Sequence, residues 1–224
     1  GGAGGETGDV AVGDGQVVGE GDYVEVDYTG WQADSTGAKA DRFTASEEDG
    51  APARLMVGSG MVNEGLDIGL TGMKVGGTRR IVVPPALAYG DQGQGDVRGG
   101  ETLIYEVTAR RILGVETETV REGSGGAVVP GRRVRFHLAG WIRDPDGTRG
   151  EKFQDSRDMQ NPYTTVMGQF KLQPGIELAL RGMKVGVLRR VHVPSELAFG
   201  SRGWHRGPRT LVPPDTDVVY EIEV

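Results

Sequence analysis

The chain has 224 residues, no cysteine and a formal net charge of −7. This length suits one or two globular domains. The negative balance disfavours a nucleic-acid partner, which a basic stripe would attract, and the absence of cysteine excludes disulfides, thiolate catalysis and zinc–sulfur sites. No apolar run reaches the ~18 residues of a membrane-spanning helix, so the sequence predicts no transmembrane segment.

The first 16 residues are rich in glycine and acidic side chains, and we expect this segment to be mobile at its start. The chain opens without Met and without a charged and apolar leader. This is expected of a processed form from which a targeting peptide has been removed.

Alternating apolar and polar residues predict strands along the next part of the chain. The first strand covers residues 23–28 and continues through 30–33 to a turn at 34–37. Residues 43–52 are polar and predict a loop, whereas residues 53–57 predict a short strand.

Residues 63–71 predict the one helix of this part of the chain. Asn63 is a suitable N-cap, and Gly72 stands where a helix end favours a left-handed residue. Apolar residues three and four positions apart form one face of this helix: Leu66, Leu70 and Met73.

Two further strands, at 78–83 and 103–109, are followed by residues 114–118, which we interpret as a linker. Pairs of arginines recur along the chain and are too scattered to form a phosphate-binding stripe. We interpret them as solvated strand ends; they stand at 79–80, 110–111, 132–133 and 189–190.

A long block of sequence occurs twice. Residues 72–90 read Gly-Met-Lys-Val-Gly-Gly-Thr-Arg-Arg-Ile-Val-Val-Pro-Pro-Ala-Leu-Ala-Tyr-Gly, and residues 182–200 repeat this pattern at an offset of 110. A period of this length is domain-sized and predicts two homologous domains in tandem, residues 1–114 and 115–224. The second domain has a loop after Gly200 that is five residues longer. It repeats the other elements, with strands at 134–138, 164–167, 188–193 and 218–224 and a helix face of Ile176, Leu180 and Met183.

Each domain therefore combines several short strands with one short helix. A single amphipathic helix is not stable alone, so its apolar face must pack on the concave side of an antiparallel sheet. The predicted fold class is α+β, with two tandem domains that each wrap a bent antiparallel β-sheet around one short α-helix.

No constellation for metal, cofactor or acid–base chemistry stands out. The three histidines are too far apart for a ligand cluster, and Gly58-Ser59-Gly60 lacks the third glycine of a dinucleotide loop. Glu25 and Asp27 share a strand face and are interpreted as solvated, because no signal of burial accompanies them. We expect no metal and no cofactor.

The motifs resemble the FKBP family of peptidyl-prolyl isomerases. Residues 27–30 resemble its His-Tyr-Thr-Gly strand, residues 42–46 its Lys-Phe-Asp-Ser-Ser segment, and residues 58–65 its Gly-x-x-x-Val-Ile-x-Gly segment. The repeated block matches its Gly-Met-x-x-Gly segment and Ala-Tyr-Gly end. The resemblance covers about residues 15–113 and 120–224, and it implies a pocket between sheet and helix that accepts X–Pro segments of client proteins.

Such a pocket requires no nucleophile or proton donor. Rotation about an X–Pro bond breaks amide resonance and takes about tens of seconds without a catalyst. The twisted amide has lost charge separation, so a dry aromatic pocket stabilises it relative to the planar ground state. The missing acid–base pairs are therefore compatible with an enzyme.

Carried over residue by residue, the match to the family is uneven, and in domain one Leu66 replaces the tryptophan of the pocket floor. The catalytic residues would be Tyr28, Phe43, Val62, Leu66, Tyr89 and Tyr105, with Asn63 binding substrate. Several positions depart from the family pattern and make the wall smaller and wetter: Thr44, Ala53, Asn63 and residues 97–100.

In domain two, the resemblance implies a weaker substrate site. Its residues would be Phe153, Tyr163, Ile176, Phe199, Leu211, Val212 and Tyr220. Leu138 replaces a tyrosine, Gln154 an acid and Gln173 an isoleucine, and Phe199 lacks the hydroxyl that would bind the substrate carbonyl. We therefore expect domain one to be the more active copy.

The leading interpretation is a two-domain isomerase that binds X–Pro segments. The alternative is a non-catalytic scaffold or assembly subunit of a larger complex, since both pockets depart from the family pattern. The wording of residues 73–80 is similar to plastid immunophilins, which favours the chloroplast thylakoid lumen, and also to bacterial members; a cytoplasmic or bacterial location is the alternative.

Overall fold

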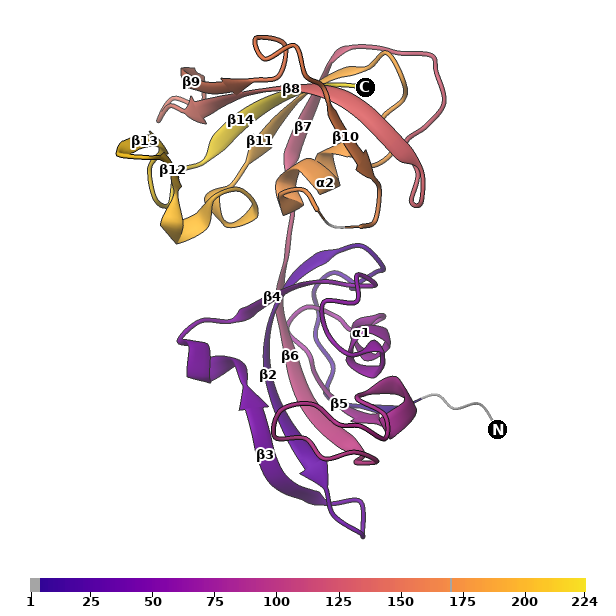
Figure 1. The fold of residues 1–224 in the computed structure, drawn as a ribbon. Helices are drawn as coiled ribbons and strands as arrows, with labels where there is room; N and C mark the ends of the chain where they lie inside the picture. The colour runs from indigo at the N-terminus through magenta and orange to yellow at the C-terminus, as the bar shows by residue number, and fades with distance from the viewer. Residues whose placement is uncertain (1–4, 170) are drawn as a thin grey trace. The chain divides into compact units, whose positions relative to one another are not determined.

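The computed structural model describes residues 5–169 and 171–224. The chain divides into two compact units between Leu113 and Gly114, one residue before the boundary that the repeat predicts. The mobility expected at the start of the chain falls on residues 1–4, which lie outside the described residues. The two antiparallel sheets, each with one α-helix, confirm the predicted α+β class (Figure 1).

The sheet of the first unit has the order β1-β5-β6-β2-β3, and β4 pairs with β2 (Figure 1). Every pairing is antiparallel. The strands predicted from alternation are present in the structure. The bounds are β1 Glu6–Ala11, β2 Tyr23–Ala33, β3 Lys39–Ala45, β4 Ala53–Met56, β5 Thr78–Val83 and β6 Leu103–Leu113.

Two parts of this unit differ from the prediction. Residues 6–11 form the edge strand β1 although every one of them is exposed. This strand is held by backbone pairing with β5, so it carries no alternating pattern. The predicted loop at 43–52 instead contains the end of β3 and a 3-10 helix, Ser46–Asp49.

Helix α1, Glu64–Leu70, begins at the predicted cap. The Oδ1 of Asn63 accepts a hydrogen bond from the Leu66 amide at 3.0 Å, and Leu66 and Leu70 are buried in the core. Gly65 and Gly69 let the helix approach β5 closely. A Cβ on Gly65 would lie 2.2 Å from Val83 Cγ1. The apolar face of the helix is therefore fixed against the sheet.

The helix ends at Leu70, and Gly72, two residues further on, adopts a φ of +79°, the left-handed conformation predicted for it. Arg79 on β5 donates to the carbonyl oxygens of Gly69 at 2.9 Å and Thr71 at 3.0 Å. These are carbonyls that a helix end leaves without partners. The interpretation of Arg79 as a solvated strand end is therefore wrong, and Arg189 caps the second helix in the same way through the Ala179 carbonyl.

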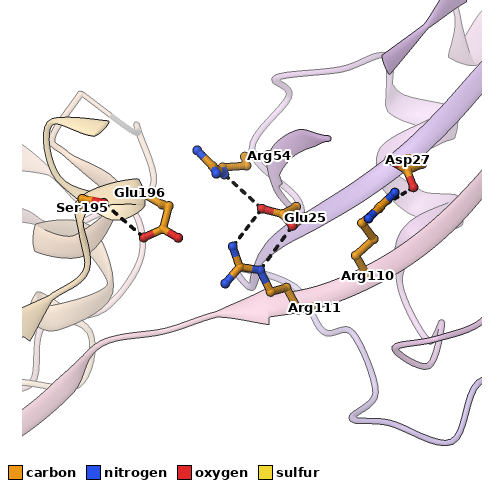
Figure 2. A network of polar contacts seen from close by, with 7 residues as sticks. All are labelled: Glu25, Asp27, Arg54, Arg110, Arg111, Ser195 and Glu196. Carbon is orange, nitrogen blue, oxygen red and sulfur yellow. Dashed lines mark hydrogen bonds and ion pairs between the residues drawn. The ribbon is translucent and has the colours of Figure 1, made fainter. Parts of the chain in front are cut away.

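Glu25 and Asp27 also differ from their predicted solvation (Figure 2). Glu25 is 8% exposed and pairs with Arg54 at 3.2 Å and Arg111 at 3.1 Å. Arg110 donates to the half-buried Asp27. Hydrogen bonds from Arg111 first, and then from Arg54, hold the pKa of Glu25 below its usual value, so this strand face is an ion-pair network.

The second unit repeats the sheet as β10-β8-β14-β11-β7, with β9 paired to β8 (Figure 1). Strand β7 occupies most of the predicted linker. Residues 114–115 alone separate it in sequence from β6, the last strand of the first sheet. The bounds are β7 Glu116–Arg121, β8 Arg133–Arg143, β9 Arg149–Asp155, β10 Tyr163–Val166, β11 Leu188–Val193, β14 Val218–Glu223 and helix α2 Pro174–Leu180.

The longer loop after Gly200 contains a hairpin that the sequence analysis did not predict. Its strands are β12, Trp204–Arg206, and β13, Arg209–Val212. Strands of this length are too short to show an alternating pattern. No helix in the described parts of the chain is long and apolar enough to cross a membrane.

Candidate functional site

A cavity of about 420 Å³ lies between the sheet and helix α1 of the first unit. The predicted residues come from five separate segments and meet here. Those lining the cavity are Tyr28 on β2, Phe43 on β3, Val62 and Asn63 before α1, Leu66 on α1, Tyr89 after β5, and Tyr105 on β6.

The aromatic rings pack around Tyr105, which is 2% exposed. Tyr28 and Phe43 meet it edge to face, with ring centroids 6.4 Å and 5.8 Å away. Gly30 makes this packing possible, because a Cβ there would lie 2.9 Å from ring atoms of both Phe43 and Tyr105. The sequence Tyr28-Thr29-Gly30 thus places the Tyr28 ring on β2 and leaves space beside it for the rings of Phe43 and Tyr105.

Asn63 connects this aromatic wall to the helix. Its Oδ1 accepts from the Leu66 amide, which orients its Nδ2 toward the Tyr105 hydroxyl at 2.7 Å. Burial first, and then the nearby Tyr89, raise the pKa of Tyr105 above its usual value. Tyr105 therefore stays neutral near pH 7, and its hydroxyl acts as a hydrogen-bonding group rather than as a base.

The remaining wall comes from the loop after Tyr89, of which sequence reasoning named only residues 97–100 as part of the pocket wall. Gln94 and Val97 exchange backbone hydrogen bonds at 2.9 Å and 3.0 Å, and the buried Gln32 donates to the Asp96 carbonyl at 3.1 Å. Four further lining residues were not predicted from the sequence: Met61, Gln94, Gly95 and Asp96. For the last three, the Gly-rich composition of the loop was the available signal.

In the second unit, the cavity at the corresponding position is about 180 Å³. Three of the predicted residues line it: Tyr163, Ile176 and Phe199. Its other walls include Leu138, Gln154 and Gln173, the residues that depart from the family pattern, together with Phe136 and Trp204.

The other predicted residues of domain two lie elsewhere. Phe153 and Leu211 line a separate cavity of about 700 Å³, which Tyr163 and Trp204 also reach. Val212 and Tyr220 are fully buried and line neither cavity. In this structure both side chains are packed in the core, and their role as substrate contacts stays a prediction.

Trp204 is one of the lining residues that sequence reasoning missed in this unit. Its indole stacks on Phe199 with centroids 5.4 Å apart and an angle of 5°, and Phe153 meets it edge to face at 5.9 Å. The available signal was its place in the longer loop after Gly200.

The polar bridge of the first unit also recurs here. The Tyr220 hydroxyl donates to the Gln173 Oε1 at 2.7 Å, so the direction of donation is opposite to that between Asn63 and Tyr105. Gln173 makes no side-chain cap for α2. Among the residues that the structure describes, no three His, Asp or Glu side chains are placed to hold a metal ion.

Each unit is thus a bent sheet around one helix, with a cavity lined by aromatic side chains. These features define a small α+β domain with an aromatic cavity between its sheet and its helix. A family model described as FKBP-type peptidyl-prolyl cis-trans isomerase matches residues 15–109 and 125–224. The chain belongs to this family.

Related proteins carry one or more copies of this domain. The chain is 32% identical to peptidyl-prolyl cis-trans isomerase FKBP10 of Bos taurus over 195 residues, which is 84% of this chain and 32% of the relative. It is 31% identical to FKBP9 of Mus musculus over 210 residues, 91% of this chain and 34% of the relative. The chain therefore spans about a third of the length of these curated relatives.

A bacterial relative and a solved structure match as well. An FK506-binding protein of Streptomyces anulatus is 46% identical over 99 residues, 43% of this chain and 77% of that protein. The crystal structure of the three FKBP domains of wheat FKBP73 aligns with a TM-score of 0.43 at 21% identity, covering 97% of this chain and 92% of that one.

Proposed function

We propose that the chain is a peptidyl-prolyl cis-trans isomerase that binds X–Pro segments of client proteins and that domain one is the working copy. The observation that carries this proposal is the 420 Å³ cavity of domain one, in which the six family-type residues meet. Its volume falls in the range of about 300–1,000 Å³ that is usual for ligand pockets.

The cavity can accelerate rotation without covalent chemistry. The barrier of ~18–20 kcal/mol arises from amide resonance, which the twisted bond has lost. Val62, Leu66 and the ring of Tyr105 supply an apolar surface that favours the less polar twisted amide over the planar one. Tyr89 lines the same cavity, and its hydroxyl would hold the substrate carbonyl.

An isomerisation assay on the full chain tests this proposal. NMR exchange between the cis and trans forms of a blocked Ala-Leu-Pro-Phe peptide reports the rate directly. We expect Tyr89→Ala to lower kcat/KM by about tenfold or more, because it removes both ring and hydroxyl from the cavity. Ile68→Ala is the matched control, since Ile68 is exposed on the outer face of α1.

The alternative proposal is a non-catalytic scaffold or assembly subunit of a larger complex. The small cavity of domain two favours it for that half of the chain, because 180 Å³ is below the usual range for a ligand pocket. Absence of catalysed exchange in the intact chain, together with co-purification of a stable complex, would favour the scaffold over the isomerase.

The compartment is a separate proposal. The amino-acid sequence of the repeated block favours the thylakoid lumen of the chloroplast, whereas the relative from Streptomyces fits a bacterial location. Cell fractionation of the source organism, followed by detection of the chain in each fraction, tests the location. Recovery in the thylakoid lumen would support the first proposal, and recovery from bacterial or cytoplasmic fractions would support the alternatives.

A further inference from the structure

Three side chains line both cavities of the second unit and separate them: Gln154, Tyr163 and Trp204. Of these, Trp204 comes from the longer loop after Gly200. It is the first residue of β12, and it lines both the 180 Å³ cavity and the 700 Å³ cavity. Most of the positions that correspond to the site of domain one line the smaller cavity, whereas Phe153, the counterpart of Phe43, lines the larger one. Trp204 therefore forms part of the wall that divides the corresponding site of domain two.

The hairpin fixes the indole in this position. Trp204 pairs with Val212 of β13, and Gly203 before it adopts a φ of +62°. A Cβ on Gly203 would lie 2.4 Å from the Val212 carbonyl oxygen, so only glycine allows this close approach. The following residue, His205, contacts Thr210 Oγ1 at 3.1 Å and thereby ties the two strands together.

Domain one has no equivalent of this partition. The loop after Tyr89 contributes Gln94, Gly95, Asp96 and Val97 to the cavity, and none of these is aromatic. Phe199 occupies the position of Tyr89 in the repeat, and its ring lies against the Trp204 indole.

We propose that Trp204 is a specificity-determining residue that occupies the ligand position on Phe199 and closes domain two to X–Pro segments. This inference rests on the proposed function, in which such a segment enters the corresponding cavity of domain one. A proline ring that entered domain two would have to displace the indole from its stack on Phe199 and from its edge contact with Phe153, losing both aromatic contacts.

The number of binding sites per chain tests this proposal. The full chain is titrated with the blocked Ala-Leu-Pro-Phe peptide by isothermal calorimetry, before and after Trp204→Ala. We expect one site in the wild type and two in the variant, with the peptide binding domain two about tenfold or more tightly than before. Trp204→Leu and Trp204→Phe should strengthen peptide binding by domain two by smaller factors. If Trp204→Ala fails to fold, these two variants test the proposal in its place.

The outcomes separate this inference from the proposed function. One site in both wild type and variants, or two sites in the wild type, would overturn the role of Trp204. No site in the wild type and one in the variant would support that role while contradicting peptide binding by domain one. No site in any form would overturn both. Arg206→Ala, an exposed change in the same strand, is the matched control and should leave the number of sites unchanged.

Discussion

The side-chain amide of Asn63 joins the start of helix α1 to the Tyr105 hydroxyl on β6, with a nitrogen–oxygen distance of 2.7 Å. The same amide caps the helix through its oxygen. In the repeat, Gln173 and Tyr220 keep the bridge, but Gln173 makes no cap. One position thus has a double role in domain one and a single role in domain two.

We expect Asn63→Ala to destabilise helix α1 by about 2 kcal/mol, because an N-cap contributes ~1 kcal/mol and a buried hydrogen bond about the same. Gln173→Ala should destabilise helix α2 by about 1 kcal/mol, since only the hydrogen bond to Tyr220 is lost. Native-state hydrogen exchange of the helix amides measures both changes in one chain. Equal losses would show that the Asn63 cap contributes nothing.

Leu70→Ala should lower the free energy of unfolding by ~2–5 kcal/mol, as for a fully buried leucine. Ile68→Ala on the exposed face should change it by less than about 0.5 kcal/mol. Urea unfolding followed by circular dichroism gives both values. A loss below half a kcal/mol for Leu70→Ala would mean that this side chain is not part of the core.

Tyr89→Phe should lower the rate of isomerisation by up to about tenfold, because a hydroxyl that binds a carbonyl contributes ~0.5–1.5 kcal/mol. Phe199→Tyr should not make domain two active, since Trp204 still covers the ring and Leu138 and Gln173 remain. NMR exchange with the blocked peptide compares the two variants with the wild type. A gain in rate from Phe199→Tyr would show that domain two is inactive only because it lacks this hydroxyl.

The Glu25 network predicts a pH dependence of stability. The folded-state pKa of Glu25 is lowered from 4.5, so its stabilisation is present above pH ~4.5 and is lost as the pH falls through the lower folded value. Because both arginines are partly exposed, we expect Glu25→Gln to cost about 1 kcal/mol at pH 7. This cost should shrink at low pH.

Urea unfolding between pH 3 and pH 7 measures the Glu25 contribution. Glu47→Gln is the control, because Glu47 is exposed and lies outside the network. A constant difference between wild type and Glu25→Gln across this range would show that the arginines do not stabilise the ionised carboxylate.

The two domains should fold independently. Each unit has its own sheet, helix and core, so fragments 1–114 and 115–224 should each show a cooperative thermal transition. A fragment that begins at residue 122 should melt at a lower temperature, because it lacks β7 and leaves the edge of β11 unpaired. Absence of a transition in either of the two longer fragments would contradict the predicted domain boundary.

The sequence by itself determined the tandem repeat, the helices with their caps and the strands that have one buried face. These features are local: the period of apolar residues reports burial on one side, and Asn63 and Gly72 mark the helix ends through their own backbone geometry. Tyr28, Phe43, Val62, Leu66, Tyr89 and Tyr105 of the domain-one cavity also followed from the sequence, because the resemblance to the family names them.

Only the tertiary structure decided the features that depend on partners far along the chain. Strands β1 and β7 are exposed on both faces and exist through backbone pairing with β5 and β11, so side-chain periodicity could not reveal them. Glu25 is buried because Arg54 and Arg111 reach it from other strands. Trp204 closes the second cavity because a hairpin places its indole on Phe199, and no local pattern encodes that contact.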